Sequence, residues 1–265
     1  MQTGASLEFD EKFNNSQCGA IDKAVKQHWT GIQGPPGTGK TGLLATIVEL
    51  LLRIADATSW ETRNLHSLTH RCVKTGDYTM KKEDKLAIVC GSNNAADNCV
   101  SAFTKVRSGK TVLRVGTMPD DPLTAKNFWI GNLKNYNEDG SKADTAIDKA
   151  EDTARLLKNA DVIVTTTASV TAGHLNGFTF WAMVIDEAGQ NTKTDSVRTL
   201  LKGVHVWVLI GDHNQLPPTI KSQDARKKCP GLEVSLLQAW TEDTCDIRMS
   251  NDYVRRELLE HPKST

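Results

Sequence analysis

The sequence GPPGTGKT at residues 34–41 constrains the fold of this 265-residue chain more than any other segment. It has the spacing of a phosphate-binding P-loop, in which glycines let consecutive backbone N–H groups converge on phosphate oxygens. Lys40 would reach the β- and γ-phosphates of a nucleotide, and the Thr41 hydroxyl would bind Mg²⁺. The residues expected to contact the nucleotide are Gly34, Pro35, Pro36, Gly37, Thr38, Gly39, Lys40 and Thr41.

The segments on either side of this loop support the P-loop interpretation. Residues 28–33 can form a buried strand, and apolar residues follow the loop in a helix expected from Lys40 to about Arg53. A strand, a glycine-rich loop and a helix in this order are the context that a P-loop requires. The positive end of that helix would favour the same anion. A Gly/Pro surface turn before a core helix is the weaker alternative.

Short runs rich in valine and isoleucine alternate with segments of helical periodicity along the rest of the chain. The expected strands cover residues 86–90, 111–115, 162–164, 181–185 and 204–210. The expected helices cover residues 95–107 and 144–159. This alternation predicts an α/β fold with a mainly parallel sheet and helices on both faces. Residues 56–84 and 119–142 are polar and interrupt the alternation, so we interpret them as insertions or as solvated loops.

Charge and cysteine content narrow the possible partners. Lysine plus arginine and aspartate plus glutamate number 32 each, so any nucleic-acid binding must come from a local groove. None of the six cysteines forms a C-x-x-C pair, which favours a reducing compartment. The residues His66, His70 and Cys72 could suggest a zinc site, but their spacing is poor for one. The apolar run 42–52 is too short to cross a bilayer and no signal segment opens the chain. We therefore expect a cytoplasmic or nuclear protein with no membrane partner.

Two further polar segments follow expected strands. Asp186 and Glu187 come directly after the strand 181–185, where Asp186 can hold Mg²⁺ and Glu187 can polarise the water that attacks a γ-phosphate. The sequence GDHNQLPP at residues 211–218 follows the next strand and places an acid and an amide at its end. Gln215 is the candidate sensor of the γ-phosphate. A surface turn would explain the prolines of this segment but not its polar residues.

With these three motifs the chain resembles the first motor domain of superfamily-one helicases of the nonsense-mediated-decay and senataxin type. That group carries GPPGTGKT, DEA(S/A/G)Q and GDxxQLPP, which residues 34–41, 186–190 and 211–218 match. The resemblance implies a RecA-like P-loop NTPase domain over residues 1–245, ATP and Mg²⁺ as cofactors, and single-stranded RNA or DNA as partner. It also implies catalytic roles for Lys40, Glu187 and Gln215.

Weaker matches to the same family fall in the expected order. Gln17 lies in a segment similar to LNxSQxxAI, whose glutamine reads the adenine edge. Residues 90–98 resemble APSNxAVDN with Gly91 in place of proline, and residues 165–169 lie where the family contacts the nucleic-acid backbone. The implied strand contacts are Ser92, Asn93, Thr166 and Thr167. Ser92 and Asn93 can also cap the following helix, which is compatible with strand contact.

The resemblance implies a second RecA-like domain whose arginine fingers complete the ATP site. Residues 246–265 are interpreted as the start of such a domain, truncated here, with a complete one supplied in trans. Arg255 and Arg256 are both candidates for the finger, because Val254 separates them from the tyrosine of the family's QYRMHP pattern. An arginine finger contributes roughly 10³- to 10⁵-fold to hydrolysis. The alternative hypothesis is therefore a non-motor, nucleotide-dependent binding module without efficient hydrolysis.

Other nucleotide-using classes fit less well. A GTPase selects guanine with N-K-x-D, and residues 191–195 (NTKTD) have the wrong spacing. A small-molecule kinase would not need the segment 211–218.

Overall fold

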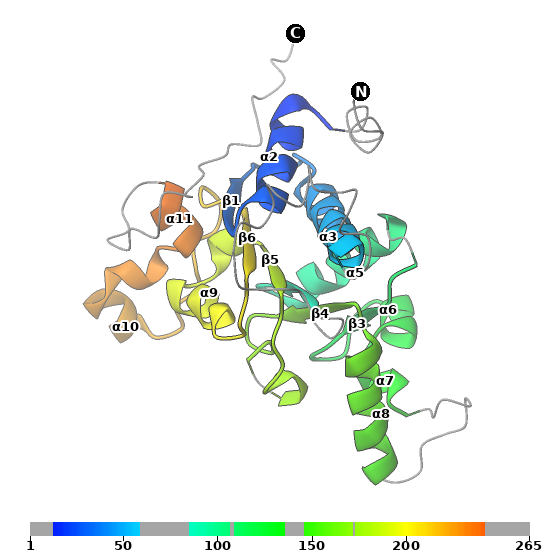
Figure 1. Ribbon diagram of the computed structural model, residues 1–265. Coiled ribbons are helices and arrows are strands. Elements are labelled where there is room, and N and C mark those ends of the chain that lie inside the picture. Colours follow the sequence, from blue (N-terminus) through cyan, green and yellow to red (C-terminus); the bar gives the residue numbers. More distant parts are fainter. Residues whose placement is uncertain (1–12, 59–84, 107–108, 136–145, 172, 242–265) are drawn as a thin grey trace, which may run out of the picture.

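The computed structural model describes residues 13–58, 85–106, 109–135, 146–171 and 173–241 (Figure 1). A six-stranded sheet forms its centre, with the strand order β1-β6-β5-β2-β4-β3 and every neighbouring pair parallel. The strands are β1 (Trp29–Gln33), β2 (Leu86–Cys90), β3 (Val112–Arg114), β4 (Val162–Thr166), β5 (Ala182–Asp186) and β6 (Val206–Gly211). The predicted α/β class and parallel sheet are confirmed.

The strands form where the sequence carries unbroken apolar runs. Every residue of β2, β4, β5 and β6 is buried, as expected for parallel strands that are covered on both faces. Strand β4 continues two residues beyond the predicted end at residue 164, because Thr165 and Thr166 pair in register with Val89 and Cys90. Strand β6 begins at Val206, two residues later than predicted.

Helices cover both faces of the sheet, as predicted (Figure 1). One face packs against α2 (Asn15–Lys26), α3 (Lys40–Thr58) and α5 (Asn93–Val106). The opposite face packs against side chains of α7 (Ile130–Leu133), α8 (Ala146–Asn159) and α11 (Leu236–Thr241). The remaining helical elements are α6 (Pro122–Asn127), α9 (Lys193–Leu200), α10 (Gln223–Lys228) and the 3₁₀ turns η1 (Gly173–Leu175), η2 (Ala188–Gln190) and η3 (Pro230–Glu233).

Part of one predicted insertion is ordered against the sheet. Within residues 119–142, α6 and α7 form, and the backbone N–H of Arg114 donates to the carbonyl of Phe128. Ile130 is buried, so residues 122–133 are not a solvated loop. The other predicted insertion falls largely on residues 59–84, which lie outside the described residues.

An aromatic cluster supports the end of the sheet that carries β1 and β6. The Trp207 ring meets the rings of Trp29 and Trp240 edge to face, with centroids 5.1 and 5.5 Å away. Trp240 belongs to α11, so the cluster fixes that helix beneath β1 and β6. No helix in the described parts of the chain combines the length and apolar character that crossing a membrane requires.

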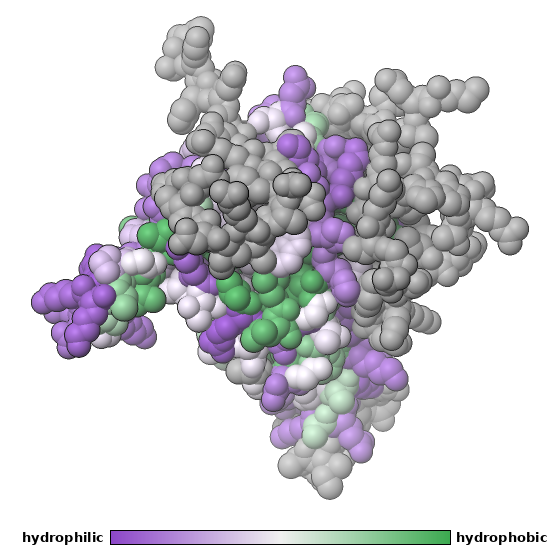
Figure 2. Space-filling view, turned by 60° about the vertical axis from the view of Figure 1, so that its left-hand side comes forward, coloured by the Kyte–Doolittle hydropathy of each residue, from purple (hydrophilic) through white to green (hydrophobic). Residues whose placement is uncertain are grey.

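The surface is mixed in polarity. Figure 2 turns the left-hand side of Figure 1 forward and shows hydrophobic residues gathered in a limited area between hydrophilic ones. Among the described residues, large apolar side chains with high exposure include Leu201 at 80% and Leu216 at 69%. Leu216 belongs to the segment 211–218, which carries the predicted γ-phosphate sensor.

Candidate nucleotide-binding site and strand-binding edge

The P-loop lies between the end of β1 and the start of α3, in the strand–loop–helix context that the sequence predicted. Gly37 and Gly39 both have a φ of 76°, a left-handed conformation that L residues other than glycine adopt only at a cost. A Cβ on Gly37 would have no heavy atom within 4 Å. The backbone conformation, and not a lack of space, therefore requires glycine at this position.

Lys40, the first residue of α3, folds back over the loop. Its Nζ donates to the carbonyl oxygens of Gly34 at 2.8 Å and Pro35 at 3.2 Å. The Thr38 hydroxyl is buried with no hydrogen-bond partner among the described residues, whereas Thr41 is half-buried. The loop therefore offers an ammonium group, a buried hydroxyl and the free N–H groups of a helix start to one small volume.

Gln17 ties helix α2 to this loop. Its Nε2 donates to the Thr38 carbonyl at 3.0 Å, and its Oε1 accepts from the backbone N–H of Asn14 at 2.9 Å, closing a capping box. The structure thus places Gln17 beside the nucleotide loop, as the adenine-reading role requires. Both ends of its amide already have partners in the chain, so reading a base would replace one of these bonds.

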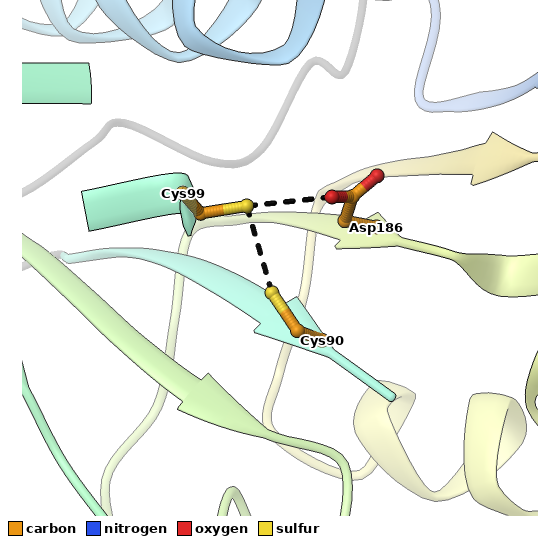
Figure 3. A group of neighbouring side chains, drawn as sticks. All are labelled: Cys90, Cys99 and Asp186. Carbon is orange, nitrogen blue, oxygen red and sulfur yellow. Dashed lines mark hydrogen bonds between the residues drawn. The ribbon is translucent and has the colours of Figure 1, made fainter. Parts of the chain in front are cut away.

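Asp186 ends β5 and is 5% exposed. The Cys99 thiol donates to its Oδ2 at 3.4 Å (Figure 3), while Oδ1 is buried with no partner among the described residues. Burial raises the pKa of Asp186, and the Cys99 hydrogen bond and the positive charge of Lys40 oppose that rise. A buried carboxylate oxygen without a partner is chemically suited to a divalent cation.

Glu187 has a φ of 52°, the one positive value of a non-glycine residue in the described parts of the chain. Such a conformation costs on the order of 1–3 kcal/mol and clusters at functional sites. Burial raises the pKa of Glu187, the charge of Asp186 raises it further and that of Asp212 adds a smaller increase, while Lys40 opposes them. Four charged side chains therefore influence one another at this edge of the sheet.

Asp212 organises the segment after β6. It is 4% exposed, and its carboxylate accepts from the Gln215 amide at 2.9 Å and from the backbone N–H of Asn214 at 3.1 Å. The Gln215 side chain thus lies against Asp212, close to the Asp186–Glu187 pair. The sequence identified Asp212 only as an acid at a strand end, and its burial could not be read from the pattern.

The sheet order brings these segments together. Because β6 lies between β1 and β5, the carboxyl ends of the three strands are neighbours. The backbone N–H of Gly34 donates to the Gly211 carbonyl at 3.0 Å, which joins the start of the P-loop to the end of β6. A Cβ on Gly211 would lie 2.8 Å from the Gly189 nitrogen, so the segments after β5 and β6 also touch through their backbones.

The predicted strand-binding residues lie farther along the same edge, at the ends of β2 and β4. Ser92 and Asn93 are exposed, and Ser92 Oγ accepts from the Ala95 N–H at 3.2 Å, which confirms its capping role. Thr166 is buried and its hydroxyl donates to Ser169 Oγ at 3.1 Å. The Thr167 N–H donates to the carbonyl of Cys90 at 3.0 Å, so the two loops are side by side.

A buried arginine supports this part of the edge. Arg114 is fully buried, and its guanidinium donates to Asp97 Oδ1 at 2.9 Å, to the Val115 carbonyl at 2.7 Å and to Asn93 Oδ1 at 3.1 Å. The ion pair with Asp97 therefore fixes the orientation of Asn93. Sequence analysis did not single out Arg114, although a lone charge inside an apolar strand was the available signal.

A pocket of about 300 Å³ opens beside Ser169, at the ends of β3 and β4. Trp129 forms one wall, and Lys134 and His174 also line it. The Trp129 Nε1 donates to the Gly116 carbonyl at 3.0 Å, and a Cβ on Gly131 would overlap the Trp129 ring. The ring is thus held in place by a hydrogen bond on one side and a side-chain-free backbone on the other.

A parallel α/β sheet with a P-loop after β1 and paired carboxylates at a nearby strand end defines a P-loop NTPase fold. The chain belongs to the AAA domain family, whose model matches residues 12–128 and 124–223. Its curated relatives also confirm the resemblance to nonsense-mediated-decay helicases that the motifs indicated.

Three relatives illustrate this similarity. The chain is 28% identical over 233 residues to "Regulator of nonsense transcripts 1 homolog" of Drosophila melanogaster, covering 85% of this chain and 18% of that protein. It is 25% identical over 245 residues to "ATP-dependent helicase NAM7" of Saccharomyces cerevisiae, covering 86% of this chain and 22% of that protein. It is 27% identical over 259 residues to "DNA replication ATP-dependent helicase/nuclease DNA2" of Saccharomyces cerevisiae, covering 94% of this chain and 14% of that protein. The chain thus spans between about a seventh and a fifth of the length of these relatives.

Proposed function

We propose that this chain is the ATP-binding motor domain of a superfamily-one helicase, which couples ATP binding and hydrolysis to the binding or unwinding of RNA or DNA. One observation carries the proposal: the P-loop, the Asp186–Glu187 pair and Gln215 lie at the neighbouring ends of β1, β5 and β6. Each belongs to a different sequence motif, and a shared nucleotide is the common reason for bringing them together. The names of the relatives support the same reading.

The residues would divide the work as follows. Residues 34–39 surround the phosphates with N–H groups, and the Lys40 ammonium leaves its carbonyl partners to meet the β- and γ-phosphates. Thr41 and the free Oδ1 of Asp186 would hold Mg²⁺, whose chemistry is to neutralise the charge that develops on the phosphate oxygens. Glu187 accepts the proton of the attacking water. Gln215 exchanges its bond with Asp212 for the γ-phosphate and so reports its presence.

A single strand of RNA or DNA would cross the ends of β2 and β4. Ser92, Asn93, Thr166 and Thr167 offer hydroxyl, amide and N–H groups, which suit contacts to phosphate and sugar and carry no sequence information. The pocket beside Ser169 widens this edge and gives it an aromatic wall.

The arginine fingers that would complete the ATP site are not among the described residues. The candidate fingers are Arg255 and Arg256. We propose that a second RecA-like domain, acting in trans on this chain, supplies the arginine that makes turnover fast. The proposed location of the assembly is the cytoplasm or the nucleus.

The first test is binding of Mg-ATP to the purified chain, compared with Lys40→Ala. We expect saturable binding by the wild type, competition by ATP over GTP and a large loss in the variant. A chain that binds no Mg-ATP, with Lys40→Ala making no difference, would remove the proposal.

The second test is the ATPase rate with and without single-stranded RNA or DNA, comparing the wild type with Glu187→Gln. The variant should retain ATP and lose hydrolysis, because its side chain keeps its size but cannot accept a proton. ATP-dependent strand binding without hydrolysis in the wild type would instead favour the non-motor binding module.

A further inference from the structure

Two buried thiols lie beside the proposed magnesium ligand and take no part in the proposed function. Figure 3 shows Cys90 at the end of β2, Cys99 on α5 and Asp186 at the end of β5 pointing toward one another. Both cysteines are fully buried, and one ligand atom from each of the three residues lies within 4.8 Å of the other two. Three separate elements therefore deliver two sulfurs and one carboxylate oxygen to the same point.

The spacing of these atoms matches the edges of a tetrahedral metal site. With zinc–sulfur bonds of about 2.3 Å and zinc–oxygen bonds of about 2.0 Å, a tetrahedron has sulfur–sulfur edges of about 3.8 Å and sulfur–oxygen edges of about 3.5 Å. The Cys90 and Cys99 sulfurs are 3.7 Å apart, and Cys99 Sγ is 3.4 Å from Asp186 Oδ2. The remaining edge, from the Cys90 sulfur to an Asp186 oxygen, is no longer than 4.8 Å, so it would shorten by up to about 1.3 Å as a tetrahedral site forms.

The chemistry of the donors selects the kind of cation. Thiolates are soft ligands that favour Zn²⁺ and similar ions over Mg²⁺ and Ca²⁺, which prefer oxygen. The hydrogen bond with Cys90, burial and the charge of Asp186 raise the pKa of the Cys99 thiol, so the cation must displace a proton that this thiol holds firmly. The positive charge of Lys40 would offset part of the negative charge of the three ligands. Three protein ligands leave a fourth tetrahedral position open, as in zinc sites that exchange a ligand.

We propose that Cys90, Cys99 and Asp186 form a binding site for a thiophilic divalent cation such as Zn²⁺. As the cation binds, each thiol releases its proton to solvent and both sulfurs become thiolate ligands. The occupied site holds the Asp186 carboxylate toward the sulfurs and removes it from the nucleotide. Removal of Asp186 from the nucleotide would inhibit ATP turnover. Only this inhibition rests on the proposed function, because binding of the cation requires no ATP.

The experiment is a titration of the metal-free, reduced 265-residue chain with Co²⁺ in the absence of nucleotide. Thiolate-ligated tetrahedral Co²⁺ absorbs visible light, so we expect a visible spectrum that saturates at one equivalent and disappears when Zn²⁺ is added. Cys90→Ser and Cys99→Ser should each weaken Co²⁺ binding roughly tenfold or more. Asp186→Asn keeps both thiols and should also weaken binding.

A matched control isolates the pair from the other cysteines. A variant with Cys18, Cys72, Cys229 and Cys245 all changed to serine retains only Cys90 and Cys99 and should keep the Co²⁺ spectrum. Loss of the spectrum in this variant while it melts like the wild type, or an unchanged spectrum in both Cys90→Ser and Cys99→Ser, would show that the thiols merely fill the core. ATP binding is measured separately without Co²⁺, so a failure of either proposal leaves the other standing.

Discussion

A Cβ atom on Gly189 would lie 2.6 Å from the backbone carbonyl oxygen of Asp212. The segments that follow β5 and β6 are therefore in direct backbone contact, at a distance that no side chain tolerates. Glu187 lies on the segment after β5 and Gln215 on the segment after β6. The distance between this proposed base and this proposed sensor therefore depends on the backbone contact.

The contact predicts that Gly189→Ala destabilises the chain and disturbs the candidate site together. Forcing a methyl group into a packed contact typically costs about 1–3 kcal/mol, and we expect a similar cost for Gly189→Ala. We expect this loss in the free energy of unfolding, measured by urea denaturation with tryptophan fluorescence, and weaker ATP binding. Gly231→Ala is the matched control, because a Cβ there has no heavy atom within 4 Å. Equal stability of the two variants would contradict the prediction.

The buried pair of Arg114 and Asp97 predicts a larger effect. Arg114→Met leaves the Asp97 carboxylate buried without its cation, which costs about 3–5 kcal/mol. Arg114→Met combined with Asp97→Leu should lose much less, because the second change removes the stranded charge. Both are measured by chemical denaturation.

The control for this pair is Arg226→Met. Arg226 pairs with Glu233 at 2.6 Å, but the arginine side chain is 59% exposed, so its loss should cost less than about 1 kcal/mol. If Arg114→Met proves as mild as Arg226→Met, the buried pair does not support the edge as inferred.

The electrostatics of Glu187 predict the acidic limb of the pH–rate profile. Burial and the charges of Asp186 and Asp212 raise the pKa of Glu187 above that of an ordinary glutamate. A general base must be ionised, so strand-stimulated ATP turnover should fall on acidification at a higher pH than an ordinary glutamate would require. Asp212→Asn removes one of the charges that raise this pKa and should shift the limb to lower pH.

Asp224→Asn provides the comparison for this shift. Asp224 lies on α10 and is not among the charges that shift the pKa of Glu187, so its substitution should leave the position of the limb unchanged. A limb that stays in place in Asp212→Asn, or moves equally in both variants, would mean that Glu187 does not govern it.

The sequence predicted five of the six strands from short apolar runs and β1 from its place before the P-loop, and their ends were located to within two residues. It did not reveal that β6 lies between β1 and β5, since this order depends on contacts between distant segments such as Gly34 with Gly211. Arg114 and the cysteine pair were missed for the same reason. Their partners lie on elements that become neighbours only when α5 packs on the sheet.

For the motif residues, the sequence indicated their positions more securely than their roles. Their position at one edge was implied by strand ends in a parallel sheet, but the roles of Lys40, Glu187 and Gln215 in chemistry stay predictions. Gln17 shows why a motif is insufficient: its amide donates to the Thr38 carbonyl, and this contact between distant segments could not be read from the spacing of the motif. The segment 247–256 and the cluster of His66, His70 and Cys72 lie outside the described residues.

The Trp129 wall predicts a separate effect on strand binding. Gly131→Ala would place a methyl group where the Trp129 ring lies, so the ring must leave its hydrogen bond with Gly116 and close or distort the pocket. We expect weaker binding of single-stranded RNA or DNA, measured by fluorescence anisotropy, with ATP affinity nearly unchanged because the P-loop lies at the other end of the sheet.

Gly173→Ala would be a poor comparison, since Gly173 has a φ of 57°. Lys126→Ala on α6 is the better control, because that residue is exposed and outside the pocket. A loss of ATP affinity equal to the loss of strand affinity would indicate general unfolding and contradict a local role for the pocket.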